Sequence, residues 1–232
     1  MIFVYQSRFI SPRLRNGMCF IDLSHEITSA MTVYPGFPEP RIGVYLSHED
    51  SRSHYDGKAE FLINEIEFVC SIGTYLDAPS HRHKGMSSIN QLALHKLAGL
   101  PGVVVDGRRN QNGSVDIDAD DLDGKAVLVR TGWDSKWMTD EYWKSPPYLS
   151  DETVKKLIER GAALVGVDWG NVDNTGNPER PAHTRLLENE ILIVENMRNL
   201  AGLDGDFRFY AIPLRIDTAS FPIRAFAQLE NL

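Results

Sequence analysis

Asp77 and His81 lie four residues apart in a short segment, Ser71–His81, that also contains Gly73 and Pro79. Glycine and proline at this spacing predict an irregular loop that aims polar side chains inward rather than a regular element. Loops of this kind often carry function, although a plain turn between a strand and a loop is the alternative interpretation. A carboxylate next to an imidazole suits either metal binding or proton transfer.

Two further polar residues, His183 and Glu195, lie beside or at the end of apolar segments. They are far enough apart for a short helix and a turn to bring the chain back. One histidine with two carboxylates is an acceptable ligand set for zinc or manganese, and an open position could hold a water whose pKa the ion lowers. A shared ion is thus compatible with Asp77, His183 and Glu195 without being required by them. The other histidines, His25 among them, are expected at the surface or in hydrogen bonds.

Aromatic residues gather in two segments that could form walls around such a site. Tyr34 and Phe37 stand in a Pro/Gly loop, where their rings could line an apolar substrate pocket or cover the core. Trp133, Trp137, Tyr142 and Trp143 follow a predicted strand, and such density is typical of a lid, a subunit interface or packing on a surface helix.

Length and composition narrow the class of protein. The 232 residues suit one α/β domain, here residues 18–232, after an N-terminal extension of residues 1–17 that could be a loose segment or an arm on a partner subunit. A net charge of −8 argues against a nucleic-acid surface. Apolar runs are too short for a membrane span or a signal peptide, and Cys19 and Cys70 suit reduced thiols, so a cytoplasmic location is expected.

The elements that would position the polar residues follow from periodicity and capping. The clearest helix is Ser150–Gly161, with Ser150 as its N-cap and Gly161 at its end. A second short helix is expected to begin in the acidic segment 116–123, and 92–100 reads as a short helix or an irregular segment. Strands are predicted at 19–23, 41–46, 58–69, 102–106, 125–132, 163–168, 191–195, 209–214 and 223–227.

Ser71–His81 resembles the signature His-x-Gly-Thr-His-x-Asp-x-Pro-x-His of the Putative cyclase family of metal-dependent hydrolases, which includes bacterial kynurenine formamidase and isatin hydrolase. Five of the seven signature positions match, whereas Ser71 and Tyr75 replace the first two histidines. The similarity extends over nearly everything after residue 18, through Ile21–His25, Tyr34–Gly36, Arg130–Trp133, His183–Leu200, Ile212–Leu214 and Pro222–Ala225.

The resemblance implies a swivelling β/β/α fold of the α/β class, with a mixed central sheet, assembled as a homodimer or homotetramer. It implies that Asp77, His183 and Glu195 bind a metal and that His81 is the acid/base on a metal-bound water. Ser71 and Tyr75 stand at the positions of the first metal's ligands. Serine and neutral tyrosine are poor ligands, so we expect one divalent metal, zinc or manganese, or none.

The expected activity is hydrolysis of an amide, lactam or related carbonyl in a small apolar or aromatic substrate, as in a formamidase. Two alternatives stay open at this point. One is a metal-free lyase or cyclase in which Tyr75 and His81 form the acid/base pair, and the other is a binding homologue without catalysis. Hydrolysis is favoured because His81, His183 and Glu195 are all present, and buried ionisable groups without a task are costly.

Overall fold

The structure is a computed structural model that describes residues 19–229. Its centre is four parallel strands in the order β5 (Ala98–Arg109), β7 (Ala126–Arg130), β9 (Leu164–Val167) and β10 (Leu192–Glu195). Strands β7, β9 and β10 are almost wholly buried, as near-continuous runs of valine, leucine and isoleucine predict for parallel strands covered on both faces.

Antiparallel strands extend this parallel centre on both sides, which makes the sheet mixed. Beyond β5 lie β11 (Phe207–Ile212), β13 (Arg224–Leu229) and β1 (Cys19–Asp22). Beyond β10 lie β4 (Tyr75–Asp77) and β12 (Ser220–Pro222). The short strands β6 (Ser114–Ile117) and β8 (Tyr148–Leu149) pair with each other at the far end of β5. The expected α/β class with a mixed sheet is confirmed.

The central strands separate two hydrophobic cores. Val127 and Val129 of β7 belong to the core beneath the helices, while Leu128 between them belongs to the core on the opposite face. This division follows from the two-residue period of a strand. The core on the face opposite the helices also contains residues of β11 and β13, including Phe209 and Ala227.

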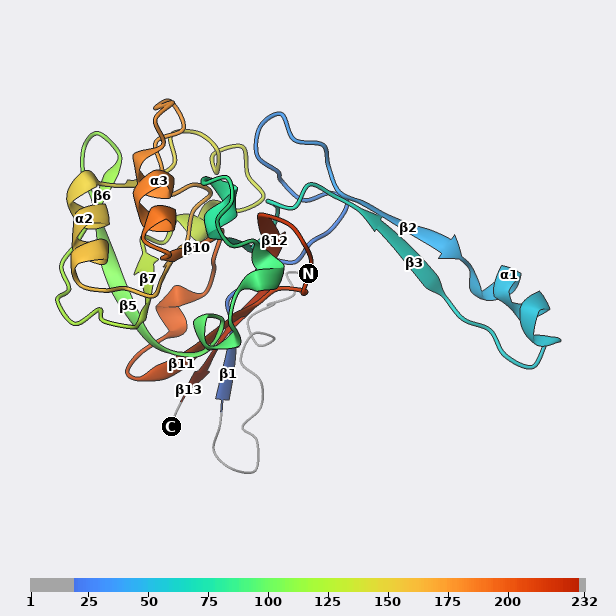
Figure 1. The fold of residues 1–232 in the computed structure, drawn as a ribbon. Coiled ribbons are helices and arrows are strands. Elements are labelled where there is room, and N and C mark those ends of the chain that lie inside the picture. The colour runs from blue at the N-terminus through green and yellow to red at the C-terminus, as the bar shows by residue number, and fades with distance from the viewer. Residues whose placement is uncertain (1–18, 230–232) are drawn as a thin grey trace.

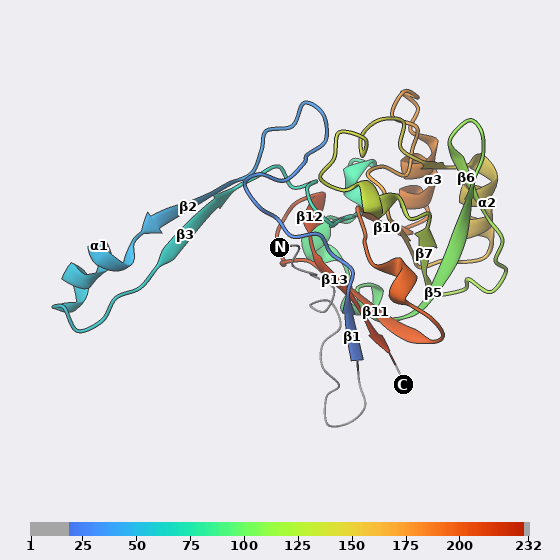
Figure 2. The same ribbon diagram turned by 180° about the vertical axis from the view of Figure 1, so that it is seen from behind.

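Two helices, α2 (Asp151–Glu159) and α3 (Pro181–Glu188), lie side by side on one face of the sheet (Figures 1 and 2). The predicted N-cap of α2 is confirmed, because the Ser150 hydroxyl accepts a hydrogen bond from the Thr153 backbone N–H at 3.1 Å. Helix α3 begins with proline, which suits the first turn. Within residues 19–229 no helix has the length and apolarity needed to cross a membrane.

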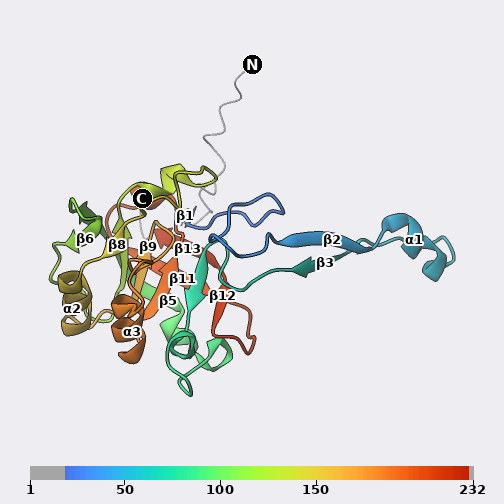
Figure 3. The ribbon, with the colours of Figure 1, turned by 90° about the horizontal axis from the view of Figure 1, so that it is seen from above.

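A two-stranded ribbon extends away from the body, as Figure 3 shows from above. It comprises β2 (Arg41–Leu46), the short helix α1 (His48–Arg52), a 3₁₀ turn and β3 (Ile63–Glu67). The strand predicted over 58–69 is therefore shorter than expected. The apolar residues of β3 do not face the protein's own core, since every residue of this strand is exposed, whereas Phe68 just after it packs against the core.

Other predicted elements need correction. Segment 116–123 forms no helix, because its start pairs with β5 as the end of strand β6 and the rest is irregular. Segment 92–100 contains a 3₁₀ turn, Leu94–Lys96, and then enters β5, which begins earlier than predicted at Ala98. Residues 1–17, expected as an extension, lie outside the described part of the chain.

Candidate metal centre and pocket

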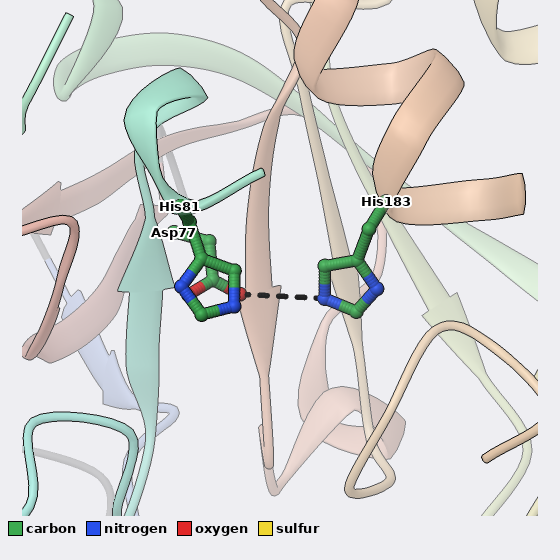
Figure 4. Close-up of side chains that lie close together, drawn as sticks. All are labelled: Asp77, His81 and His183. Carbon is green, nitrogen blue, oxygen red and sulfur yellow. Dashed lines mark ion pairs between the residues drawn. The ribbon is translucent and has the colours of Figure 1, made fainter. Parts of the chain in front are cut away.

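Three polar side chains are brought together by adjoining elements of the body. Asp77 ends strand β4, and a 3₁₀ turn, Pro79–His81, follows at once. His183 lies in the first turn of α3, which reaches across to them (Figure 4). Strand β10 pairs antiparallel with β4 and places Glu195 opposite Tyr75. Segments about a hundred residues apart in the chain thereby meet at one edge of the central sheet.

Asp77 is the centre of this cluster. Its Oδ1 lies 3.6 Å from His81 Nδ1, and its Oδ2 lies 3.7 Å from His183 Nε2. Both oxygens are buried and lack a hydrogen-bond partner among the described residues. A buried carboxylate without hydrogen bonds is costly, so a ligand between it and the two imidazoles is the expected compensation. Donor atoms of Asp77, His81 and His183 all lie within 4.8 Å of one another, which suits one metal ion.

His183 is held in place from behind by Asp173, which the sequence did not single out. His183 Nδ1 lies 2.6 Å from Asp173 Oδ2, so Nδ1 carries the proton and Nε2 faces Asp77. Burial disfavours the imidazolium. The bond to Asp173, together with Asp77 and Glu195, outweighs this and raises the pKa of His183 to about 10. Such an orienting carboxylate is typical of metal-ligating histidines.

Asp173→Asn is expected to weaken metal binding roughly 10–100-fold, because the variant loses the charged partner that orients His183. Helix α3 should persist, since an asparagine oxygen still accepts a backbone N–H at the helix start, where Asp173 now accepts those of Ala182 and His183. Titration calorimetry with zinc or manganese measures the change. Asp151→Asn, at an exposed position, is the matched control, and equal affinities in the two variants would contradict the assignment.

Glu195 lies beside this cluster, and both its oxygens accept hydrogen bonds. Oε1 accepts the Val172 backbone N–H at 2.7 Å and lies 3.6 Å from His183 Nε2, while Oε2 accepts a short hydrogen bond from the Tyr75 hydroxyl. Burial is the main reason that the pKa of Glu195 is raised to about 7, with Asp77 adding to it and His183 opposing it. Glu195, which was predicted to bind the metal, thus lies near Asp77 and the two histidines, but its oxygens already accept hydrogen bonds from Val172 and Tyr75.

The two positions that depart from the family signature are occupied by hydrogen-bonded hydroxyls. Burial first, and then the charges of Glu195 and Asp77, raise the pKa of Tyr75 well above its usual value, so its phenol stays protonated. Ser71 Oγ lies 2.8 Å from Ser220 Oγ on the neighbouring strand β12. Neither side chain offers the deprotonated nitrogen, sulfur or oxygen that zinc prefers. A second metal ion therefore lacks ligands at these positions.

The signature glycine has a steric reason in this chain. Gly73 has φ +59°, a left-handed conformation that favours glycine, and a Cβ there would lie 2.9 Å from Ile27 Cγ1. Asn196, directly after Glu195, donates its side-chain N–H to the Gly73 carbonyl at 2.7 Å. This contact ties the signature loop to the end of β10.

A cavity of about 290 Å³ adjoins the cluster. Tyr75, His81 and His183 are among the residues that line it. Its walls are aromatic. They contain Tyr34 and Phe37, the two residues predicted to line a pocket, together with Trp137 and Trp143. The Tyr34 ring centroid lies 5.4 Å from that of Phe37 and 5.5 Å from that of Trp143. Two cationic residues without a distinctive sequence pattern, Arg82 and Arg180, also line the cavity.

His25 behaves differently from the expectation of a surface or hydrogen-bonded histidine. It is buried and stacks on Trp137 at 4.0 Å between ring centroids, and its ring nitrogens have no hydrogen-bond partner among the described residues. Burial, followed by the charge of Arg198, lowers the pKa of His25 to about 3. Its role is to support the Trp137 wall of the pocket.

Acidification should therefore destabilise the fold through His25. Its folded pKa is below the unfolded value of 6.5, so the stability it contributes is complete above pH 6.5 and is lost as the pH falls toward 3. At pH 5 the loss is about 2 kcal/mol relative to pH 7. His25→Phe keeps a ring on Trp137 without a titrating group, so urea unfolding of this variant should show a smaller loss. An identical loss in both proteins would exclude His25 as its source.

Comparison with known proteins identifies the family of this chain. Residues 21–174 match the model of the family described as Putative cyclase. The chain belongs to this family. As a member of the Putative cyclase family, it is 28% identical to a kynurenine formamidase of Bacillus cereus over 208 residues, which cover 89% of this chain and 95% of that protein.

Solved structures show the same fold. An isatin hydrolase bound to the product analogue thioisatinate has a TM-score of 0.76 and 20% identity, covering 93% of this chain and 94% of that one. Isatin hydrolase A from Labrenzia aggregata, bound to benzyl benzoate, has a TM-score of 0.74 and 20% identity, with coverage of 91% and 94%. The predicted cyclase-like fold is thereby confirmed. The hydrolase names among the relatives support an enzyme over a binding homologue.

Proposed function

We propose that this Putative cyclase family member is a metal-dependent hydrolase of an amide or lactam bond in a small aromatic substrate. The observation that carries the proposal is the buried Asp77 carboxylate, which has no hydrogen-bond partner among the described residues and faces two histidines that line the pocket. The names of the relatives, kynurenine formamidase and isatin hydrolase, agree with this class of reaction.

We assign one divalent cation, zinc or manganese, to Asp77, His81 and His183. Such an ion polarises a carbonyl and lowers the pKa of a water. The geometry favours His81 over Glu195 as the third ligand, since the donor atom of His81 lies within 4.8 Å of those of Asp77 and His183. The acid/base role assigned to His81 from the sequence is the alternative, and metal content separates the two.

In this assignment the hydrogen-bonded pair of Tyr75 and Glu195 donates and accepts the proton that hydrolysis transfers. The Tyr75 hydroxyl donates to Glu195 Oε2, and the pKa of Glu195, raised to about 7 chiefly by burial, lets its carboxyl gain or lose a proton near neutral pH. Tyr75 borders the cavity, which puts this hydrogen-bonded pair beside the place where a substrate would bind. The chain thus has a proton donor and acceptor at a position where the family signature has a metal ligand.

The pocket walls favour an aromatic substrate that carries an acidic group. Tyr34, Phe37 and Trp143 contact one another through their rings and supply an apolar face. Arg82 and Arg180 line the same cavity, and guanidinium groups recognise carboxylates by paired hydrogen bonds. At about 290 Å³ the cavity is at the lower end of the range for small-molecule sites. An aryl formamide with a carboxylate is the substrate class to test first.

His81→Asn tests the proposal. We expect the variant to lose both hydrolysis of an aryl formamide and most bound metal, measured by elemental analysis after zinc or manganese loading. Retained metal with lost activity would instead make His81 the acid/base. His95→Asn, at an exposed position outside the pocket lining, is the control. Wild-type protein that takes up no metal after loading would overturn the metal-dependent mechanism.

A further inference from the structure

The cavity beside the metal centre is lined by positive charge in an otherwise acidic protein. The whole chain has 32 aspartate and glutamate residues against 24 lysine and arginine residues. Among the described residues that line the cavity there are two arginines, Arg82 and Arg180, and no aspartate or glutamate. The two carboxylates at the metal centre, Asp77 and Glu195, are fully buried and do not line the cavity. Charge of one sign around a concave site attracts ligands of the opposite sign, so this lining favours an anionic ligand.

Arg180 has no acidic partner within the described part of the chain. Its guanidinium makes one hydrogen bond there, from Nη1 to the Asn171 side-chain oxygen at 3.4 Å. That oxygen is uncharged, and it also accepts the Asp173 backbone N–H at 2.9 Å. Most of the guanidinium N–H donors of this half-buried arginine are thus left for another acceptor. Arg180 therefore has both the charge and the donors to bind an anion.

Asn171 supplies a second donor beside this guanidinium. The hydrogen bonds from Asp173 and Arg180 both reach its Oδ1, so they fix the orientation of the side-chain amide. The other amide atom, Nδ2, donates no hydrogen bond within residues 19–229 and is not one of the buried polar atoms without a partner, so it is accessible. Because Asn171 lines the cavity, its Nδ2 can donate to a ligand there.

Two contacts across the loop between β9 and α3 connect this donor pair to the metal centre. The first joins Asn171 to Arg180. The second joins Asp173 to His183, which follows Arg180 by three residues at the start of α3. The bond from the Asp173 N–H to Asn171 links the two contacts. Since both contacts are built on the same turn and the same helix start, an anion bound by the first would lie at a defined place relative to a metal on His183.

We propose that Asn171 and Arg180 bind the acidic group of the substrate and thereby determine its specificity, an inference that rests on the proposed hydrolase function. Arg180 supplies the charge and paired N–H donors, and Asn171 adds a neutral donor. Arg82 contributes less. Its Nε already donates to Thr184 Oγ1 at 2.9 Å, and its side chain is exposed, where water and salt weaken attraction to an anion.

Substrates that differ only in the acidic group test the assignment. Formanilide is neutral, and its counterpart is whichever isomer of formamidobenzoate (2-, 3- or 4-) has the lowest KM with wild type. Arg180→Gln should raise the KM for the formamidobenzoate roughly 10–100-fold, because charge-assisted hydrogen bonds are lost, and leave that for formanilide within about twofold. Arg82→Gln should raise the first KM less than about threefold. Arg215→Gln, at an exposed position outside the cavity lining, is the control.

Asn171→Asp separates recognition from a structural role. An aspartate oxygen still accepts the Asp173 N–H, so the turn should persist, but the free N–H donor becomes a second acceptor beside Arg180. This variant should lose the preference for the formamidobenzoate while keeping the metal content and unfolding temperature of wild type. An unchanged KM for the formamidobenzoate, an equal loss with formanilide, or an equal loss in Arg82→Gln would overturn the assignment.

Binding without turnover keeps the subsite separate from the proposed hydrolase function. In titration calorimetry, Arg180→Gln should bind the corresponding aminobenzoate roughly 10–100-fold more weakly than wild type does, whereas aniline should bind both proteins equally. Zinc-loaded and metal-free proteins are both titrated, because the metal-free protein excludes binding of the carboxylate to the ion. If wild type hydrolyses neither formamide but this difference holds, the hydrolase proposal fails and the subsite stands. Equal affinity of wild type and Arg180→Gln for the aminobenzoate would overturn the subsite.

Discussion

Asp77→Asn should abolish metal binding and reduce hydrolysis by about 10³-fold or more. Asp77 is the residue that both histidines face, and its buried oxygens have no other described partner. An amide in its place is a weak ligand without charge, and loss of several kcal/mol of metal-derived stabilisation corresponds to this change in rate. Elemental analysis and initial rates with an aryl formamide measure the two effects.

Thermal unfolding gives an independent readout of the same variant. Saturating zinc or manganese at about 100 times the dissociation constant should stabilise wild type by about 2.7 kcal/mol, whereas Asp77→Asn should gain nothing. Asp106→Asn removes an exposed, ion-paired carboxylate and is the control, which should respond like wild type. Equal stabilisation of all three proteins by metal would place the ion elsewhere.

If one ion binds per chain, as proposed above, Ser71→His combined with Tyr75→His should raise the bound metal to two ions per chain. These substitutions remove the Ser71–Ser220 and Tyr75–Glu195 hydrogen bonds and put imidazole donors beside Asp77, as in the family signature. Both positions face the cavity, so the added rings have space there. Elemental analysis after zinc loading measures the change.

Each single variant serves as a control for the double one. Ser71→His or Tyr75→His alone supplies one new imidazole, so a second ion should bind at least tenfold more weakly than in the double variant. A double variant that still holds one ion would show that more than these two side chains separates this chain from a two-metal site. If hydrolysis of an aryl formamide also rises, Ser71 and Tyr75 account for the difference in activity.

The sequence predicted the body of the fold better than the ribbon, for physical reasons. The buried strands β7, β9 and β10 are continuous apolar runs, and helix α2 has a serine cap, an acidic first turn and an apolar stripe. The ribbon residues show the same alternation as core strands. Local pattern does not reveal whether a strand faces the core of its own chain.

The candidate site was predictable in its members and not in their roles. Asp77, His81 and His183 lie close together, because a loop signature and a helix start place them near one sheet edge. The predicted ligand set was Asp77, His183 and Glu195 with His81 as the acid/base, and these roles stay predictions. Asp173 gave no signal, since an aspartate in a polar loop usually caps a turn, and only the folded chain shows it behind His183. The bond between Tyr75 and Glu195 depends on the antiparallel pairing of β4 with β10, which connects residues 120 positions apart.

The backbone that the ribbon shares with the pocket has a consequence for engineering this enzyme. Tyr34 and Phe37 come just before β2, Ser71 and Gly73 follow β3, and all four residues line the cavity. A change in the length of the ribbon would therefore displace two segments of the pocket wall at once. Side-chain substitutions on β2 and β3 leave the backbone that carries these segments in place.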